Sequence, residues 1–232
     1  MSSTSASPSD LARGGPAAYP VSRWYVIPIT RRIASRLTHT PVRPTHITLL
    51  GLLPGLSAAG LLFADPGAGG VAAALVLAAW FADRTDGLLA RSQHSASPFG
   101  AWLDANIDEL HDVVWHAGAA YAAAALSASQ LPWFLLIGFL AGKYLFMTGL
   151  AEERTLNGSG EPQPAVPAAA GSCGWIRAAY HLPGNSDIRL HLLIAGLATG
   201  WMTAELALVA AYYNFRWIAR FGLTARRLEG CR

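Results

Sequence analysis

The sequence is poor in charged residues. Only 13% of its 232 residues are Asp, Glu, Lys or Arg, against about 25% in an average soluble domain. Hydrophobic residues make up 53%, and the mean hydropathy is +0.32. This composition excludes a disordered chain and disfavours a water-soluble globule. The 23 Gly and 14 Pro follow no period, which excludes a collagen-like chain. We therefore expect a polytopic membrane protein.

Cysteine and lysine are also scarce. The two cysteines, Cys173 and Cys231, show no metal-ligand spacing and provide no disulfide framework. Lys143 is the single lysine, and the other 16 basic residues are Arg. The pI of about 9.1 is explained by the positive charge that collects on cytoplasmic flanks of membrane helices, so we predict no nucleic-acid partner.

The N-terminal region divides into two parts. Residues 1–20 are rich in Ser, Ala, Pro and Gly and lack the apolar core of a signal peptide, which predicts a disordered tail. Residues 23–37 (RWYVIPITRRIASRL) combine apolar side chains with four Arg. This pattern indicates a basic amphipathic helix on the membrane surface, bent or interrupted at Pro28. The alternative is a basic flank of the first membrane span.

Six apolar stretches approach the roughly 20 residues that a membrane-spanning helix needs. They cover approximately 45–63, 71–91, 99–126, 131–151, 188–200 and 202–221, and the fifth is short. We predict an all-α membrane domain with six spans over 21–225, followed by a C-terminal tail over 226–232. The segment 157–174 of the one long connection is interpreted as a flexible link rather than a lid.

Basic residues indicate the orientation of these spans. The connections between the first and second, third and fourth, and fifth and sixth stretches contain no Lys or Arg, whereas the other connections and both ends of the chain contain Arg. The positive-inside rule therefore predicts a multi-pass protein of the cell membrane with both termini in the cytoplasm.

Acidic residues are concentrated in one region. Six of the 14 lie between positions 83 and 112, namely Asp83, Asp86, Asp104, Asp108, Glu109 and Asp112. A carboxylate in a membrane helix costs about 2.5–3.5 kcal/mol, and neighbouring carboxylates repel one another. Arg84 and Arg91 are too few to neutralise them all. Bound divalent cations are the expected compensation.

The spacing of four aspartates supports this interpretation. Asp83 and Asp86 are three residues apart, and Asp104 and Asp108 are four apart, so each pair lies on one face of a helix. The intervening turn can bring the two faces together as a cage of oxygen ligands. Such ligands select Mg²⁺ or Mn²⁺ over zinc. For any single aspartate, the alternative is solvated charge near a cytoplasmic loop.

These residues belong to one longer pattern, Asp83-x2-Asp86-Gly87-x2-Ala90-Arg91-x8-Gly100-x3-Asp104-x3-Asp108. The pattern resembles, without gap or substitution, the signature of the CDP-alcohol phosphotransferases. Its eight fixed positions are far more specific than a lone glycine-rich loop. The six stretches and the N-terminal helix extend the resemblance loosely over 21–225. Residues 44–48 (PTHIT) are similar to a second family segment, Pro-Asn-x-Ile-Thr, with Thr45 in place of Asn.

The resemblance implies an enzyme of phospholipid or related phosphodiester biosynthesis. Such enzymes transfer the phosphoryl-alcohol part of a CDP-alcohol, either CDP-diacylglycerol or a soluble donor, to an acceptor alcohol and release CMP. It implies a homodimer with a cytoplasm-facing site and two divalent ions, Mg²⁺ or Mn²⁺. The implied metal ligands are Asp83, Asp86, Asp104 and Asp108, of which Asp108 is also the base. The implied contacts to the CDP part are Thr48, Gly87, Ala90, Arg91, Ser97 and Gly100. Arg84 is unusual in this pattern, and we expect it to affect the donor's phosphate contacts.

Basic residues in the later helices are candidates for binding the acceptor. Lys143 lies near the middle of the fourth stretch, where an unpaired ammonium is costly, so we expect it to face a polar cavity and bind an anionic acceptor. Pairing with a helix-borne carboxylate is the alternative. Arg189 and Arg216 are further candidates, with flanking charge as their alternative. Cations beside the metals suit a phosphorylated acceptor such as inositol phosphate or glycerol phosphate. Residues 184–190 (GNSDIRL) also resemble a segment of di-inositol-phosphate synthases, whose donor is soluble CDP-inositol.

Two other functions use similar residues. An intramembrane Mg²⁺-dependent prenyltransferase also holds a diphosphate between aspartate-rich segments, and a non-enzymatic divalent-cation transporter lines its path with carboxylates. Release of CMP from a CDP-alcohol separates these functions from the phosphotransferase. Four histidines near the motif, His46, His94, His111 and His116, are interpreted as interfacial or packing residues.

Overall fold

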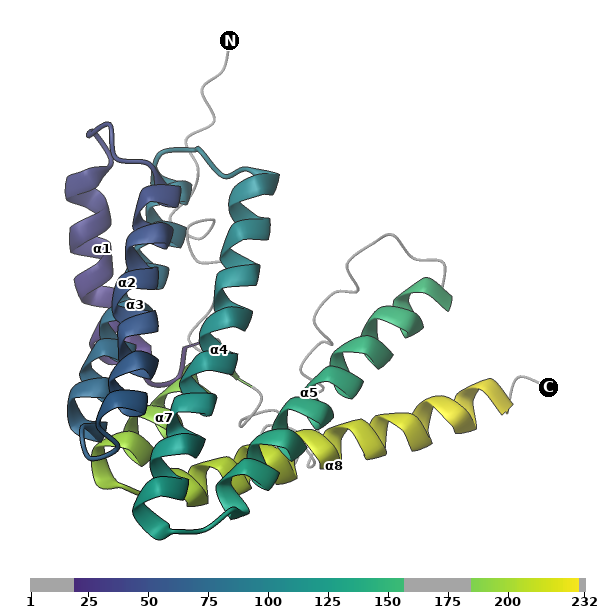
Figure 1. Cartoon of the computed structure of the whole chain (residues 1–232). Helices are drawn as coiled ribbons and strands as arrows, with labels where there is room; N and C mark the ends of the chain where they lie inside the picture. Colours follow the sequence, from purple (N-terminus) through teal and green to yellow (C-terminus); the bar gives the residue numbers. More distant parts are fainter. Residues whose placement is uncertain (1–18, 157–184, 230–232) are drawn as a thin grey trace.

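The computed structural model of the chain describes residues 19–156 and 185–229, and these contain helices and no strand. A short 3-10 turn, η2 (Ser22–Trp24), comes first. The α-helices are α1 (Val26–Leu37), α2 (Pro44–Ala64), α3 (Gly69–Ser92), α4 (Pro98–Ser127), α5 (Leu131–Leu156), α7 (Ser186–Thr199) and α8 (Met202–Glu229) (Figure 1). The last six coincide with the six predicted stretches, and α8 continues past the predicted domain boundary at 225. The predicted link 157–174 lies outside the described residues.

Capping residues explain where the helices near the signature begin. Pro44 is the first residue of α2 and follows Arg43, which has an extended backbone. Ser97 is the N-cap of α4, and its Oγ accepts a 3.0 Å hydrogen bond from the Gly100 N–H. Proline suits the first turn because its missing N–H has no partner there, and serine is among the best N-cap residues. These local signals place the PTHIT segment and the second half of the signature at helix starts, whereas the first half of the signature lies at the end of α3.

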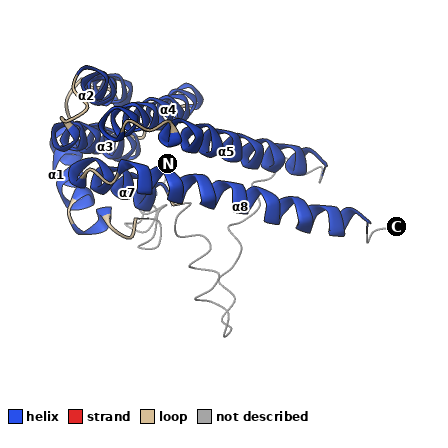
Figure 2. Ribbon diagram, turned by 60° about the horizontal axis from the view of Figure 1, so that its bottom comes forward, coloured by secondary structure: helices blue, strands red, loops and turns tan. Residues whose placement is uncertain are grey.

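The helices form a bundle with a projecting pair. α2, α3 and α4 pack together, and α1 and α7 pack against α3. α5 and α8 lie side by side and extend away from the bundle (Figures 1 and 2). The bundle core is rich in small side chains, including Ala58, Ala73 and Ala119. Small residues allow membrane helices to approach closely, which fits a bundle built from apolar helices.

The N-terminal helix is a separate element. Val26, Thr30 and Ala34 of α1 are buried at spacings of four residues, and the side chains between them include exposed Arg. Residues 38–43 separate α1 from α2, which confirms a helix of its own rather than a flank of the first span. The expected interruption at Pro28 is wrong, because proline in the first turn of a helix needs no backbone partner.

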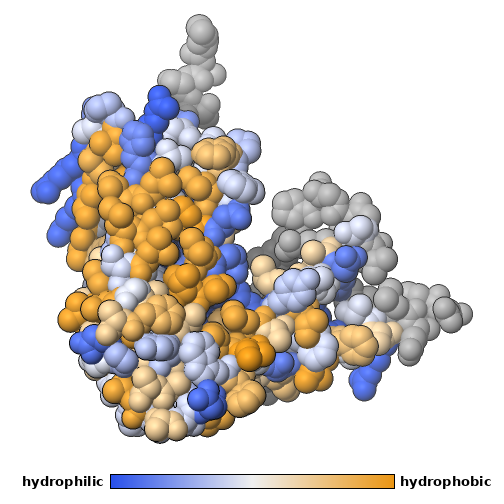
Figure 3. All heavy atoms as spheres, viewed as in Figure 1, coloured by the Kyte–Doolittle hydropathy of each residue, from blue (hydrophilic) through white to orange (hydrophobic). Residues whose placement is uncertain are grey.

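Two helices meet the length and hydropathy criteria for membrane spans, α2 and the part Leu131–Glu153 of α5. The 14 residues of α7 extend only about 21 Å, which is less than the roughly 30 Å hydrocarbon core. Six spans are therefore not confirmed. Large apolar side chains are nevertheless exposed along α2, namely Leu49, Leu50, Leu53, Leu56 and Phe63. Figure 3 shows a broad hydrophobic surface, in orange, on the helical bundle. An exposed apolar face of this kind fits contact with lipid.

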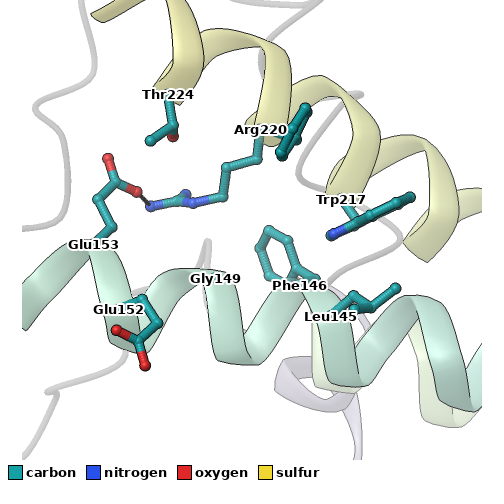
Figure 4. A pocket seen from close by; sticks show the side chains of 9 residues that line it. Leu145, Phe146, Gly149, Glu152, Glu153, Trp217, Arg220 and Thr224 are labelled. Carbon is teal, nitrogen blue, oxygen red and sulfur yellow. Dashed lines mark hydrogen bonds and ion pairs between the residues drawn. The ribbon is translucent and has the colours of Figure 1, made fainter. Parts of the chain in front are cut away.

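Polar contacts join α5 to α8. Arg220 forms an ion pair with Glu153 across a cavity of about 200 Å³, and Phe146 and Trp217 line the same cavity (Figure 4). Nearer the bundle, the Asn214 amide donates a 2.8 Å hydrogen bond to the Gly138 carbonyl oxygen. These contacts fix the two helices against each other.

Candidate active site

Three aspartates of the signature meet between α3 and α4. One carboxylate oxygen from each of Asp83, Asp104 and Asp108 lies within 4.8 Å of the others. Carboxylates at this separation repel one another strongly where water is scarce, so the cluster favours binding of a cation. Several carboxylate oxygens are the ligands that Mg²⁺ and Mn²⁺ prefer. The residues present therefore fit a divalent ion of this type.

Asp86 lies apart from these three carboxylates. It is only 4% exposed, and its Oδ2 accepts a 2.5 Å hydrogen bond from the Thr48 hydroxyl on α2. The same hydroxyl lies 3.1 Å from the Pro44 carbonyl oxygen. The structure thus connects the PTHIT segment to the signature through this pair, and a role of Asp86 as a metal ligand stays a prediction.

A cavity of about 610 Å³ adjoins the aspartates between the start of α2, the end of α3 and the start of α4. Asp86 and Asp104 line it. The six residues predicted to contact the CDP part also line it, namely Thr48, Gly87, Ala90, Arg91, Ser97 and Gly100. The structure therefore brings this whole predicted set to one cavity, although the set is dispersed over three helices.

Details of this cavity suit a phosphate-bearing ligand. A Cβ at position 87 would lie 3.6 Å from the Arg91 guanidinium, so glycine leaves space beside that group. The Ser97 oxygen accepts from the Gly100 N–H, while its own O–H proton can still be donated. Sequence reasoning missed Arg43, which also lines the cavity directly before the PTHIT segment. Arginine donors at two sides can pair with phosphate oxygens.

A second cavity, of about 200 Å³, has Asp108 in its lining. Its lining includes Trp80 of α3, Asp108 and Asp112 of α4, and Arg189 of α7. Asp104 lines the first cavity and Asp108 the second, and these residues are one helical turn apart. Two of the clustered carboxylates thus belong to different cavities.

Comparison with known proteins decides what this arrangement belongs to. Residues 42–202, which include both motif segments and most of the bundle, match the CDP-alcohol phosphatidyltransferase family. The chain belongs to this family. It is therefore a CDP-alcohol phosphotransferase, as the resemblance of its signature indicated. Membership favours this function over the prenyltransferase and the cation transporter.

Individual relatives agree with the family. The chain is 29% identical over 217 residues to the archaetidylinositol phosphate synthase of Methanothermobacter thermautotrophicus, covering 90% of this chain and 93% of that protein. It is 26% identical over 191 residues to the bifunctional IPC transferase and DIPP synthase of Aquifex aeolicus, covering 81% of this chain. The corresponding Rubrobacter xylanophilus protein is 38% identical over 125 residues. The chain spans only 41% and 28% of these two bifunctional proteins.

A solved structure shares the fold of this phosphotransferase. Mycobacterium tuberculosis phosphatidylinositol phosphate synthase (PgsA1), determined with CDP-DAG bound, aligns with a TM-score of 0.60 over 84% of this chain and 92% of that chain. The sequence identity is 20%, so this likeness shows the fold.

In the phosphotransferase, Lys143 pairs with carboxylates of α4. Lys143 is 7% exposed, and its Nζ donates a 2.7 Å hydrogen bond to Glu109 Oε2 and an ion-paired hydrogen bond to Asp112. This contact is the alternative that the sequence left open. Arg189 shares Asp112, since its Nε lies 3.2 Å from Asp112 Oδ1. Arg189 lines the second cavity, whereas the described lining lacks Lys143, so contact of Lys143 with an acceptor stays a prediction.

Arg216 is positioned differently from the other two acceptor candidates. Its guanidinium carbon lies 4.1 Å from the centre of the Phe146 ring, and it donates a 2.8 Å hydrogen bond to the Tyr212 hydroxyl. The described linings of both cavities lack Arg216. The structure does not bring Arg216 to the site, because aromatic contacts hold its side chain in the α5–α8 interface.

Sequence reasoning assigned no role to Asp112, which is the centre of the polar contacts beside the second cavity. Its position one turn after Asp108 was a usable signal, because residues four apart share a helix face. His116, one turn further, is buried and contacts Glu205 at 3.3 Å through its Nε2. His111 stacks on Trp115 with ring centres 4.6 Å apart, which confirms its packing role.

Proposed function

We propose that this phosphotransferase moves the phosphoryl-alcohol group of a CDP-alcohol to a phosphorylated acceptor, with release of CMP and dependence on two divalent ions. The observation that carries the proposal is that Asp104 lines one cavity and Asp108, one helical turn further along α4, lines another. One cavity is lined by the signature residues and fits a nucleotide-linked donor. The other contains Arg189 and fits a smaller anionic acceptor.

The chain's own residues support a direct transfer between the two cavities. Asp108 is the exposed member of the cluster and faces the acceptor side, so its carboxylate takes the proton of the acceptor hydroxyl. The new bond joins the acceptor oxygen to the β-phosphorus, and the bond from that phosphorus to the CMP oxygen breaks. Arg91 and Ser97 hold the donor phosphates. When bound, the divalent ions supply the positive charge that neutralises the pyrophosphate oxygens.

An inositol phosphate is the acceptor that the observations favour. Arg189 uses its Nε and one terminal nitrogen on Asp112 and Tyr213, and a guanidinium has five N–H donors, so donors remain for a phosphate. The names of two related proteins, archaetidylinositol phosphate synthase and phosphatidylinositol phosphate synthase, state products that contain inositol phosphate. The donor alcohol is the part that these relatives leave open, because CDP-DAG is bound in one neighbour and a soluble CDP-inositol remains the other candidate.

We further propose that the enzyme is a homodimer in the cell membrane with six spans and with both termini and the active site in the cytoplasm. The absence of Lys and Arg from three connections supports this orientation. A cytoplasmic site also suits a CDP-activated donor, which is made there.

The decisive experiment measures CMP release by the purified protein in detergent micelles. CDP-diacylglycerol and CDP-inositol serve as donors, and inositol phosphate, glycerol phosphate and inositol serve as acceptors, with Mg²⁺ or Mn²⁺. We expect CMP release only with inositol phosphate, and none in excess EDTA. Equal rates with unphosphorylated inositol would contradict the proposal of a phosphorylated acceptor. Full turnover in EDTA would contradict the metal dependence.

A further inference from the structure

Arg84 lies between the first two aspartates of the signature and binds the first of them. Its Nε donates a 2.5 Å hydrogen bond to Asp83 Oδ2, and a terminal nitrogen forms an ion pair with the same oxygen. The two side chains are only 17% and 14% exposed, so water screens their attraction weakly. Asp83 is one of the three clustered carboxylates, so the guanidinium neutralises part of the negative charge that would otherwise attract a metal ion.

Two aromatic side chains hold Arg84 in this orientation. Its guanidinium carbon lies 4.1 Å from the centre of the Trp80 ring and 5.1 Å from the centre of the Tyr19 ring. A terminal nitrogen also donates a 2.7 Å hydrogen bond to the Tyr19 hydroxyl. Cation–π contacts and the hydrogen bond together restrict a side chain that otherwise has many rotamers.

The segment directly after Tyr19 is held by a buried carboxylate of α7. Asp187 is fully buried and accepts hydrogen bonds from the backbone N–H groups of Val21, at 2.8 Å, and Ser22, at 3.0 Å. The Ser22 hydroxyl also bonds to Asp187, and it accepts a 2.9 Å hydrogen bond from the Trp80 indole. The segment before α1 is thereby attached to both α7 and α3, which fixes Tyr19 beside the guanidinium.

We propose that Arg84 is a built-in counter-ion that competes with a divalent cation for Asp83, and that Tyr19 is the positioning residue that holds Arg84 there. This proposal rests on the metal-dependent reaction proposed above. Without an ion, the guanidinium lowers the repulsion among Asp83, Asp104 and Asp108. With an ion bound, the two cations share Asp83, so the affinity for the ion is lower than the carboxylates alone would give.

Direct titration with Mn²⁺ tests this proposal without a turnover assay. Free Mn²⁺ is counted by electron paramagnetic resonance as the ion is added to the purified full-length protein. A neighbouring positive charge lowers the affinity of a carboxylate for a proton by about ten- to thousandfold. A comparable effect on a metal ion means that Arg84→Gln should bind Mn²⁺ at least about tenfold more tightly. Tyr19→Phe loses one hydrogen bond, and about two- to tenfold tighter binding is expected. Arg36→Gln removes an exposed Arg of α1 and should bind Mn²⁺ as the parent does.

Thermal unfolding provides a second measurement. In EDTA, Arg84→Gln should unfold at a lower temperature than the parent, because the three carboxylates then lack their counter-ion. Saturating Mn²⁺ should remove most of this difference. In an Asp83→Asn background, Arg84→Gln should no longer tighten Mn²⁺ binding, because the shared carboxylate is absent.

The outcomes separate this proposal from the proposed function. If the parent binds Mn²⁺ and both Arg84→Gln and Tyr19→Phe bind it equally or more weakly, the counter-ion role is wrong while metal dependence stands. Should Arg84→Gln weaken only CDP-alcohol binding, Arg84 is a donor ligand and the proposal is overturned. If the parent binds no Mn²⁺, both proposals fail. If Arg84→Gln does not fold, the Tyr19→Phe titration decides alone.

Discussion

The Thr48 hydroxyl on α2 and the Asp86 carboxylate on α3 are joined by a 2.5 Å hydrogen bond in the wall of the 610 Å³ cavity. Both side chains are less than a tenth exposed. A buried carboxylate without such a donor is costly, so this contact both orients Asp86 and stabilises its charged form. The bond also connects the PTHIT segment to the signature.

Replacement of Thr48 should therefore affect the donor side of the reaction. Thr48→Val keeps the shape but removes the donor to Asp86, and we expect the free energy of unfolding to fall by about 1–3 kcal/mol. We also expect kcat/KM for the CDP-alcohol to fall at least tenfold, as measured by CMP release, because Asp86 loses its orientation. Thr48→Ser retains the hydroxyl and should keep most of both values. Equal losses in the serine and valine variants would contradict a role of this hydrogen bond.

The base is tested by a change at Asp108 that preserves its volume. Asp108→Asn removes the charge that accepts the proton, so turnover should fall by about 10²–10⁴-fold at saturating Mg²⁺. Binding of the CDP-alcohol should stay within about tenfold of the parent, or about 1.4 kcal/mol. Turnover within a few-fold of the parent would mean that another group accepts the proton. Loss of donor binding would instead assign Asp108 to metal ligation.

The remaining aspartates of the signature are expected to be required through the metal. Asp83→Ala, Asp86→Ala and Asp104→Ala should each abolish CMP release, since each removes a carboxylate that we propose as a metal ligand. Isothermal titration with Mg²⁺ should show weaker ion binding in the same variants. An active Asp86→Ala variant with unchanged ion binding would show that Asp86 is not a ligand.

Arg189 provides a test of the acceptor. Arg189→Lys retains the charge beside Asp112 but loses the planar fork that binds phosphate in pairs of hydrogen bonds. The KM for inositol phosphate should rise at least about fivefold, while the KM for the donor stays unchanged. Arg216→Lys is the matched control, because Arg216 lies in the α5–α8 interface, and its two KM values should equal those of the parent. A higher donor KM in Arg189→Lys would argue against an acceptor role.

Two glycines of α2 give a matched pair for stability. A Cβ at position 55 would lie 2.1 Å from His111 Nε2, and His111 cannot move easily because it stacks on Trp115. Gly55→Ala should therefore lower the free energy of unfolding by about 1–3 kcal/mol. At Gly60 no atom lies within 4 Å of an added Cβ, so Gly60→Ala should be neutral or stabilise by about 0.5–1 kcal/mol. Thermal unfolding in the same detergent measures both, and equal effects would contradict this packing.

The sequence by itself determined the elements and the signature. Runs of apolar residues predicted the six helices from α2 onward, because hydropathy and proline or serine at helix starts act locally. Spacings of three and four residues placed Asp83 with Asp86 and Asp104 with Asp108, since the helical period alone decides which side chains share a face. Six residues of the 610 Å³ cavity were likewise identified by family resemblance, five of them within the stretch 83–108 and Thr48 in the PTHIT segment.

Tertiary packing decided how those faces meet. The rotation of α3 relative to its neighbours brings Asp83 close to Asp104 and Asp108 and directs Asp86 toward Thr48. The spacing of residues along one helix cannot predict this rotation. Lys143 pairs with Asp112, and Arg216 contacts Phe146. Both contacts depend on which helices pack against α5 and α8. The contact of Tyr19 with Arg84 joins residues 65 positions apart. Long-range contacts of this kind depend on the packing of the whole bundle, so they became visible only in the folded chain.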